Sequence, residues 1–354
     1  MPRDLSADIS AALSKRDAAR FCEAILPQVS RTFALGIRVL RGELGQAVLD
    51  AYLLCRIADT VEDAPLLAPE AKARLFDEFI DSVRQGSVSS GFAAQVKHLG
   101  GNTAHLTLSR NADLVFEHFA VLSGETHDAV VKWVTEMASG MRKFVLKHPD
   151  GIRIRTLEEY REYCYYVAGT VGHMLTDLWR LHAPGVDTKR HIMLARRCRA
   201  FAEALQTVNI LKDVAVDAVD ENSIYVPDEW LRAAGSSQAH LLAPELLHEN
   251  RAALSRLVDL AWHDLDEAYR YLLDIPRRAY TVRLFCIFPL LLAYATLRDL
   301  SSSNELLTNG SVVKISRREV KSLLAMGMLI AASNSGVRWL VNRVRARPFH
   351  LLPT

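Results

Sequence analysis

The stretch from Tyr52 to Asp63, YLLCRIADTVED, is an apolar run of helical character that ends in carboxylates. No Gly or Pro interrupts it before Pro65, which predicts one continuous helix. Asp59 and Asp63 stand four residues apart and share a helix face, with Glu62 beside them. Clustered carboxylates repel one another, and a hard cation such as Mg²⁺ relieves that repulsion. A solvated acidic helix end is the alternative that this stretch alone leaves open.

A second stretch, QTVNILKDVAVD at residues 206–217, repeats the pattern. Its polar positions recur at i, i+3, i+7 and i+11, on one stripe of a helix. The stripe consists of Gln206, Asn209, Asp213 and Asp217. Two acidic stripes on separate apolar helices are suited to holding a diphosphate through several Mg²⁺ ions. Together, the two stretches favour a metal-dependent enzyme over a solvated helix end.

Composition excludes several classes of protein. The chain has 354 residues, half of them apolar, which is enough for a large core and excludes a disordered protein. Lys plus Arg total 43 against 41 Asp plus Glu, and the basic residues are dispersed, so we expect no nucleic-acid partner. The five cysteines show no metal-ligand spacing, as is typical of reduced cysteines in cytoplasmic proteins. The N-terminus carries acids, unlike a secretory signal.

Helical patterns cover nearly the whole chain. We expect continuous helices over residues 103–122, 191–217 and 317–345, and a buried apolar helix over 278–297. Only residues 312–316, VVKIS, favour an extended segment. Because Pro289 breaks the most apolar run, no run reaches the roughly 18 residues of a membrane-spanning helix. We therefore predict an all-α fold, one domain over residues 1–354 with helices around a central apolar cavity, and loose order in residues 1–16.

Six segments spread over residues 30–289 together resemble the squalene/phytoene synthase family, in the order typical of that family. The segments are SRTF (30–33), YLLCRIADTVED (52–63), YCYYVAGTVG (163–172), QTVNILKDVAVD (206–217), YVP (225–227) and LFCIFP (284–289). Each is weak alone, but the set is specific. The resemblance implies the isoprenoid synthase fold of class I terpenoid enzymes. It also implies a transferase that condenses two farnesyl diphosphates head to head.

Within the family, the chain resembles the members that form squalene. For these, the resemblance implies Mg²⁺-dependent formation of presqualene diphosphate from farnesyl diphosphate, followed by reduction to squalene with NADPH. Family members that make dehydrosqualene or phytoene, or that stop at presqualene diphosphate, are the alternative. A non-catalytic assembly-factor homologue is a further alternative, which the presence of both acidic motifs disfavours.

The resemblance also assigns roles by position in the family motifs. The implied Mg²⁺ ligands are Asp59, Glu62, Asp63, Asp213 and Asp217. The implied phosphate contacts are Arg31, Arg56 and Lys212. Tyr163 matches a tyrosine proposed as proton acceptor or carbocation stabiliser, with a packing role as the alternative. Other implied substrate contacts are Ser30, Phe33, Tyr52, Gln206, Asn209 and Phe285, although residues 30–32 also fit an ordinary helix N-cap.

The NADPH contacts implied by the resemblance centre on Lys314 in the VVKIS segment. A 2′-phosphate calls for cations, and Arg317 and Arg56 are further candidates. The alternative is that Lys314 is a surface lysine on a short connector.

Two positions depart from the family pattern. Val216 stands where members usually carry an acid, and the segment AVDENSIYVP after the second motif lacks the usual basic residue. Lys212 could bind phosphate in place of the missing basic residue, or Mg²⁺ could contribute more to phosphate binding. Because squalene is insoluble in water, we also expect peripheral membrane contact during product release. The basic stretch from Arg338 to Arg347 is a candidate for that contact, with a solvated helix end as the alternative.

Overall fold

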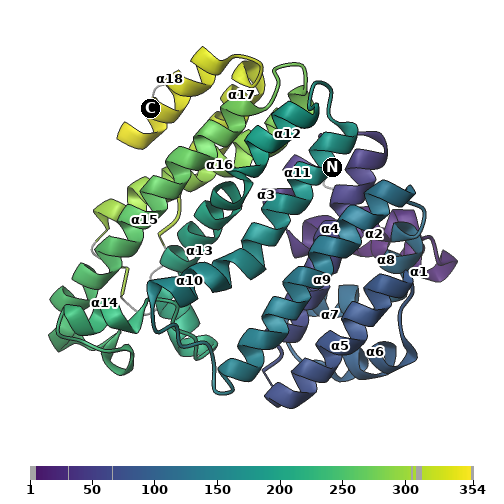
Figure 1. The fold of residues 1–354 in the computed structure, drawn as a ribbon, viewed down its shortest axis with the longest axis horizontal. Coiled ribbons are helices and arrows are strands. Elements are labelled where there is room, and N and C mark those ends of the chain that lie inside the picture. Colours follow the sequence, from purple (N-terminus) through teal and green to yellow (C-terminus); the bar gives the residue numbers. More distant parts are fainter. Residues whose placement is uncertain (1–4, 31, 66, 304–305, 308–312, 352–354) are drawn as a thin grey trace. The chain divides into compact units, whose positions relative to one another are not determined.

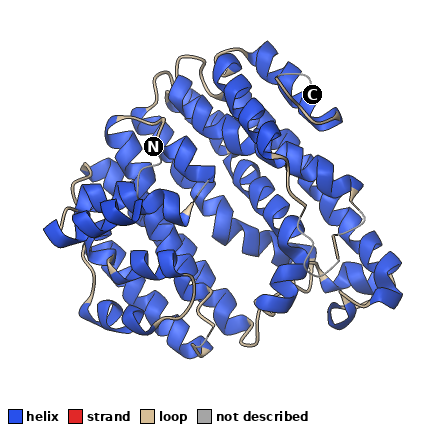
Figure 2. Cartoon of the chain, turned by 180° about the vertical axis from the view of Figure 1, so that it is seen from behind, coloured by secondary structure: helices blue, strands red, loops and turns tan. Residues whose placement is uncertain are grey.

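The computed structural model describes residues 5–30, 32–65, 67–303, 306–307 and 313–351. These residues form helices joined by loops, as Figure 2 shows. Within the described ranges, the only β-type pairing is an isolated parallel bridge between Arg153 and Ile224. The all-α prediction is therefore confirmed.

The chain divides into two compact units. Unit 1 comprises Met1–Pro149 and Asp177–His182, and unit 2 comprises Asp150–Thr176 and Ala183–Thr354. Helix α11 (Thr170–His182) contributes residues to both units. The single domain and its central cavity stay predictions.

In unit 1, α4 packs against α8 and α9, and α5 packs along α9, where Figure 1 shows them side by side. Fully buried phenylalanines such as Phe76, Phe79 and Phe116 fill the core between these helices. The helices are α1 (Leu5–Lys15), α2 (Ala18–Val29), α3 (Thr32–Ile37), α4 (Gly42–Glu62), α5 (Pro69–Gln85), α6 (Ser90–Gln95), α7 (Thr103–Arg110), α8 (Ala112–Phe119) and α9 (Gly124–Lys147), with a 3₁₀ turn at Val96–His98.

In unit 2, α13 packs against α15, and α16 contacts α15, α17 and α18. The other helices are α10 (Leu157–Cys164), a π-helical turn (Tyr165–Gly169), α12 (Thr188–Ala195), α13 (Cys198–Asp220), α14 (Asp228–Ala233), α15 (Leu247–Asp274), α16 (Tyr280–Ser302), α17 (Arg317–Ile330) and α18 (Asn334–Ala346), with 3₁₀ turns at Gln238–His240 and Pro244–Leu246.

Helix α16 is the central apolar element of unit 2. Pro289 lies inside it, so the expectation that this proline breaks the apolar run was wrong. A proline costs one backbone hydrogen bond within a helix, and burial of most neighbouring side chains outweighs that loss here. By length and composition alone, α16 is also the one described helix that could cross a membrane, but 78% of its most apolar window is buried in the structure.

Three predicted helices are divided in the structure. Residues 103–122 form α7 and α8, separated at Asn111, whose φ of −115° and ψ of 33° are not helical. Residues 191–217 fall into α12 and α13, with Arg197 outside the helical region between them. Residues 317–345 form α17 and α18, and the Ser333 side chain caps the second by accepting the N–H of Gly336. Local backbone breaks of this kind leave the apolar periodicity intact, so periodicity alone does not reveal them.

Two terminal or connecting segments also bear on the predictions. Helix α1 occupies most of the segment for which we expected loose order, and residues 1–4 lie outside the described residues. Residues 313–316 form a loop rather than a strand, and Val312 lies outside the described residues.

Candidate functional site

The first acidic motif occupies the C-terminal turn of α4. The helix ends at Glu62, and Asp63 follows as its C-cap, donating its backbone N–H to the carbonyl of Asp59 at 2.9 Å. No basic residue lies in the last turn. The negative end of the helix dipole favours cations, so Asp59, Glu62 and Asp63 lie where their charges are least stabilised by the backbone. This arrangement favours a bound cation.

Arg56 is the cation nearest to this motif on α4. Its Nη1 lies 3.1 Å from Oδ2 of Asp59, with both side chains less than one-third exposed. Burial raises the pKa of Asp59, and the charge of Arg56 partly opposes that rise. Asp59 in turn raises the pKa of Arg56. The Nε of Arg56 is buried and has no hydrogen-bond partner within the part of the chain that the structure describes.

Aromatic side chains flank this ion pair. The Arg56 guanidinium lies 5.9 Å from the ring centroid of Tyr52, whose hydroxyl donates to the carbonyl of Val29 at 3.2 Å. Phe33 packs on Tyr52 with ring centroids 5.9 Å apart. Ser30 accepts the N–H of Phe33 at 3.1 Å, so it caps α3, the alternative that its sequence had left open. The predicted phosphate contact Arg31 lies outside the described residues.

The second acidic motif occupies the last turns of α13, in unit 2. Asp213 and Asp217 are partly exposed, the helix ends at Asp220, and again no basic residue lies in the last turn. Lys212 Nζ lies 3.0 Å from Oδ2 of Asp213. Gln206 is partly exposed and Asn209 is exposed on the same helix. Both motifs thus place carboxylates at the C-terminal end of a long helix.

A cation from another part of the sequence reaches the loop after α13. Arg153 donates to the backbone and side-chain oxygens of Asn222. Asn222 has a left-handed φ of 48°, and Gly151 faces it with a φ of 105°. A Cβ on Gly151 would lie 2.0 Å from the Asn222 carbonyl oxygen, so the two loops meet only because residue 151 is glycine. The segment without a basic residue of its own therefore contacts a basic residue supplied from about 70 positions earlier.

Tyr163 lies at the end of α10, buried with 4% of its surface exposed. Its hydroxyl donates to the hydroxyl of Tyr225 at 3.4 Å, and the two ring centroids are 5.0 Å apart. The π-helical turn at Tyr165–Gly169 follows directly, a feature that is frequent at functional sites. Phe285, another predicted cavity residue, is buried on α16.

The small residues after Tyr163 allow close helix packing. A Cβ on Gly172 would lie 2.2 Å from the carbonyl oxygen of Cys198, the first residue of α13. A Cβ on Gly169 would lie 3.0 Å from the Glu203 carboxylate. The described contacts therefore support close packing of this stretch against α13.

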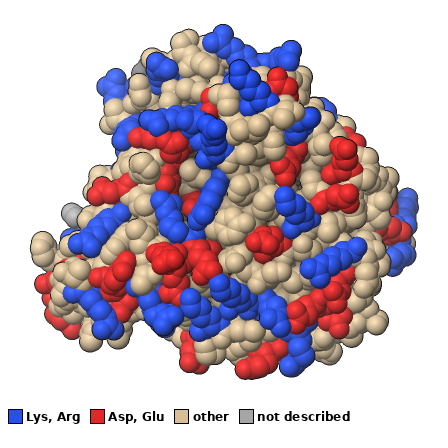
Figure 3. Space-filling model, in the orientation of Figure 1, with Lys and Arg blue, Asp and Glu red and all other residues tan. Residues whose placement is uncertain are grey.

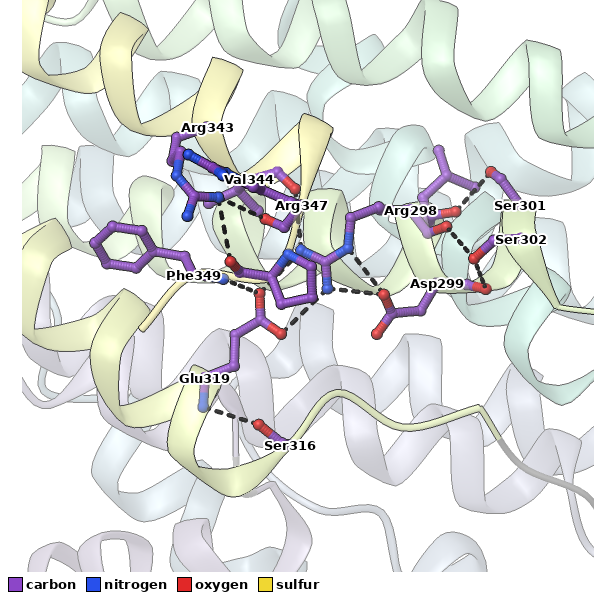
Figure 4. Close-up of polar contacts among 12 residues, drawn as sticks. Arg298, Asp299, Ser301, Ser302, Ser316, Glu319, Arg343, Val344, Arg347 and Phe349 are labelled. Atoms are coloured by element: carbon purple, nitrogen blue, oxygen red, sulfur yellow. Dashed lines mark hydrogen bonds and ion pairs between the residues drawn. The ribbon is translucent and has the colours of Figure 1, made fainter. Parts of the chain in front are cut away.

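The predicted cofactor cations lie at the start of α17. Lys314 and Arg317 are exposed. Ser316 caps α17 by accepting the N–H of Glu319 at 3.1 Å (Figure 4). The Glu319 carboxylate is buried and accepts two hydrogen bonds from Arg298, at 2.9 and 3.1 Å. This bidentate pair anchors the beginning of α17 and with it the loop that carries Lys314.

The basic stretch of α18 is engaged within unit 2. Arg345 pairs with Asp266 at 3.1 Å, Arg343 donates to the carbonyls of Arg347 and Pro348, and Arg338 donates to the hydroxyl of Tyr269. Lys and Arg side chains are interspersed with Asp and Glu over the face drawn in Figure 3. That face therefore shows no broad patch of one sign.

The predicted residues fall into two groups, one in each unit. Unit 1 brings together Ser30, Phe33, Tyr52, Arg56, Asp59, Glu62 and Asp63, and unit 2 carries Tyr163, Gln206, Asn209, Lys212, Asp213, Asp217, Phe285, Lys314 and Arg317. Sequence reasoning missed Arg153 and Tyr225 as neighbours of the second group. It also missed His105 on α7, whose pKa is lowered by burial and by the charge of Arg56. Tyr225 could have been found, because it lies in the YVP segment, but no sequence signal marks the other two.

Comparison with known proteins identifies related chains. Residues 26–319 match the model of the squalene/phytoene synthase family. A squalene synthase of Schizosaccharomyces pombe is 27% identical over 307 residues, covering 84% of this chain and 64% of that protein. The chain spans about three fifths of the length of the first curated relatives that it matches.

Solved structures with the same architecture agree with this match. A complex of TcSQS with the ligand BPH1237 superposes with a TM-score of 0.79 at 25% identity, covering 95% of this chain and 94% of that one. A dehydrosqualene synthase in complex with a ligand gives a TM-score of 0.55 at 20% identity, covering 95% of this chain and 98% of that one. At that identity the second likeness shows the fold alone. The predicted isoprenoid synthase fold is confirmed.

Proposed function

Because the chain belongs to the squalene/phytoene synthase family, we propose that it is a farnesyltransferase that forms squalene. It would condense two farnesyl diphosphates to presqualene diphosphate with Mg²⁺ and reduce that intermediate with NADPH. The relatives named squalene synthase support this choice of product within the family. Since the chain is shorter than those relatives, the complete activity is our proposal.

The proposal rests on the structural features that the two acidic helix ends have in common. In both α4 and α13 the carboxylates lie at the C-terminal turns, with no basic residue in the last turn of the helix and with a basic side chain paired to an aspartate. Carboxylate oxygens are the donors that Mg²⁺ prefers, and the helix dipole adds further negative potential. Asp59, Glu62 and Asp63 in unit 1, and Asp213 and Asp217 in unit 2, would hold Mg²⁺. Bound Mg²⁺ neutralises the charge that develops on the leaving diphosphate.

Basic side chains would contact the phosphates directly. Arg56 and Lys212 each pair with a carboxylate of the motif next to them and retain donors for a phosphate oxygen. Arg153 fulfils in unit 2 the role of the basic residue that the AVDENSIYVP segment lacks. These contacts orient the diphosphate and hold it away from the developing carbocation.

The aromatic residues would stabilise the carbocation. A ring face stabilises a nearby cation by about 0.5–2 kcal/mol without forming a bond to it. Phe33 and Tyr52 in unit 1 and Phe285 in unit 2 are suited to this role. Tyr163, with its hydroxyl hydrogen-bonded to Tyr225, would accept the proton that is lost when the cyclopropane ring closes.

NADPH, when bound, supplies the hydride for the final reduction. Lys314 and Arg317 are exposed cations at the anchored start of α17, which fits recognition of a phosphate-bearing cofactor. Arg56 stays a third candidate from the sequence.

The test is product identity after incubation with farnesyl diphosphate and Mg²⁺, with and without NADPH. We expect squalene only with NADPH. Without it, we expect presqualene diphosphate, rearranged alcohols and dehydrosqualene. If the same products form with and without NADPH, the protein is a dehydrosqualene or phytoene synthase. The absence of any product would favour a non-catalytic homologue.

We also propose that product leaves toward a bilayer, because squalene is insoluble in water. Unit 2 exposes Leu329 and Trp339, 78% and 52% exposed, on the two C-terminal helices. Apolar side chains of this size add to binding at a lipid interface. Co-sedimentation with lipid vesicles should fall when both are replaced by Ser, and unchanged sedimentation would contradict the proposal.

A further inference from the structure

Three helices of unit 1 bring a thiol, a carboxylate and an imidazole together away from the acidic motif. Cys22 lies on α2, Asp50 on α4 and His118 on α8. One ligand atom from each, the sulfur, a carboxylate oxygen and a ring nitrogen, lies within 4.8 Å of the other two. Asp50 precedes Asp59 by nine residues, which is about 14 Å along the helix axis. This Cys–Asp–His cluster is therefore separate from the end of α4.

The carboxylate of the cluster is incompletely satisfied. Asp50 is fully buried, and its Oδ1 lies 2.5 Å from Nδ1 of His118. Its Oδ2 is buried and forms no hydrogen bond of ordinary geometry with the described residues, although the Gln46 side chain is near enough to lower the pKa of the carboxyl. Buried polar atoms are nearly always paired, and a buried carboxylate oxygen without a partner is costly in free energy. This oxygen is therefore free to coordinate a ligand.

The donor set selects the chemical class of that ligand. Sulfur, imidazole nitrogen and carboxylate oxygen together suit Zn²⁺ or a similar transition metal, whereas Mg²⁺ and Ca²⁺ prefer oxygen ligands only. A thiolate and a carboxylate carry two negative charges, which neutralise a divalent ion in a buried place. Burial raises the pKa of the Cys22 thiol and raises the pKa of Asp50 to about 6. A bound dication reverses both effects, because it stabilises the deprotonated ligands.

The cluster is accessible from solvent on one side. His118 lines an open cavity of about 1260 Å³ together with Glu23 and Gln46. The carboxylate of Glu23 is close enough for its charge to contribute to raising the pKa of both Cys22 and His118. An ion can therefore enter through the cavity, and a water molecule is available as a further ligand.

We propose that Cys22, Asp50 and His118 form a binding site for Zn²⁺ or a similar transition metal, with a fourth coordination position open to the cavity. The ion would replace the direct Asp50–His118 hydrogen bond and tie α2, α4 and α8 together. This site is independent of the proposed Mg²⁺–diphosphate chemistry.

The experiment titrates Co²⁺ into the reduced full-length protein with Mg²⁺ in excess, and follows the near-ultraviolet charge-transfer band that a cobalt–thiolate bond produces. We expect a band that saturates at one equivalent of Co²⁺ and is displaced by Zn²⁺. Cys22→Ser should abolish the band. Cys164→Ser is the matched control, because Cys164 is equally buried but lies on α10 outside the cluster, and it should leave the band unchanged.

Two further variants keep the test decisive if Cys22→Ser fails to fold. Asp50→Asn and His118→Gln should each weaken Zn²⁺ binding at least tenfold, measured by competition against Co²⁺. The variants Asp59→Asn and Asp213→Asn should retain the band, so the outcome does not depend on the proposed enzymatic function. Absence of a thiolate band in the wild-type protein, or a band that survives in Cys22→Ser, would overturn the proposal.

Discussion

The C-terminal ends of α4 and α13 present the same functional groups in different surroundings. At the end of α4, Arg56 of the same helix pairs with Asp59 across one turn, and Lys72 of α5 donates to the carbonyl of Glu62. At the end of α13, Lys212 pairs with the adjacent Asp213, and a second cation, Arg153, comes from a distant loop. Burial raises the pKa of Asp59, so a neighbouring cation is needed to favour its ionised form.

Basic side chains reach these two helix ends in two ways, from the same helix or from another segment of the chain. A cation three residues earlier on the same helix is visible in the sequence. A cation supplied by a contacting loop is not, because the contact depends on the left-handed backbone at Asn222 and on Gly151 facing it. The segment after the second motif, which has no basic residue of its own, therefore contacts Arg153.

The largest expected effect comes from removing one carboxylate at either helix end. Asp59→Asn and Asp213→Asn should each lower kcat by about 10²–10³-fold or more, because the charge on the departing diphosphate loses a metal ligand. Product formation at saturating Mg²⁺ is the measurement. Both proteins should remain folded, since each substitution also relieves repulsion between neighbouring acids.

The matched control for this pair is Asp259→Asn, at an exposed aspartate on α15. It should leave kcat unchanged. If only one of the two motif variants lost activity, the equivalence of the two helix ends would be wrong. Near wild-type activity in both would remove the metal-binding interpretation altogether.

The next effect concerns the tyrosine pair of unit 2. Tyr163→Phe should slow formation of presqualene diphosphate by about 10²-fold, the lower range for loss of a general acid or base. Binding of farnesyl diphosphate should change little, because the ring remains. Single-turnover kinetics separates the two steps.

Tyr225→Phe is the informative companion variant. It removes the hydroxyl that accepts the hydrogen bond from Tyr163 and leaves the Tyr163 hydroxyl in place, so the slowing should be about tenfold or less. Unchanged kinetics in Tyr163→Phe would reduce this residue to a packing role next to the π-helical turn.

The sequence was sufficient for the fold class and for the location of both acidic motifs. Apolar helical periodicity and acids at i, i+4 spacing are local patterns, and α4 and α13 carry them where predicted. Helix breaks at Asn111 and Arg197 were not predictable from periodicity, since a single non-helical residue leaves the apolar spacing nearly unchanged. Pro289 was misjudged for the opposite reason, because tertiary burial outweighed a local rule.

The residues that the sequence did not reveal all depend on long-range contacts. Arg153 contacts Asn222, about 70 residues later in the sequence. The charge of Arg56 on α4 lowers the pKa of His105 on α7. The Cys–Asp–His cluster gathers residues from α2, α4 and α8, with no spacing that resembles a metal motif. Such groups are determined by packing, which single-sequence patterns do not encode.

Two substitutions with smaller expected effects compare the cation from the distant loop, Arg153, with the cation on α4, Arg56. Arg153→Gln should raise the KM for farnesyl diphosphate about five- to tenfold, which corresponds to the usual net contribution of one hydrogen bond, about 1 kcal/mol. Arg56→Gln should have a larger effect, because it also leaves Asp59 without its ion pair. Arg155→Gln is the control, since Arg155 lies on the same loop and is exposed. Equal behaviour of Arg153→Gln and Arg155→Gln would show that the loop cation only supports Asn222.

The smallest expected effect concerns NADPH binding. It distinguishes a residue that contacts the cofactor from the residues of the two acidic motifs. Lys314 is exposed, and an exposed ion pair contributes about 0.2–1 kcal/mol, so Lys314→Ala should raise the KM for NADPH only about two- to fivefold. The first half-reaction, assayed without NADPH, should be unaffected, because it depends on the two acidic motifs. Lys321→Ala, at an exposed lysine on α17, is the matched control and should leave the KM for NADPH unchanged. A slower first half-reaction in Lys314→Ala would place this lysine with the diphosphate rather than with the cofactor, and an unchanged KM for NADPH would leave it as a surface residue of the loop before α17.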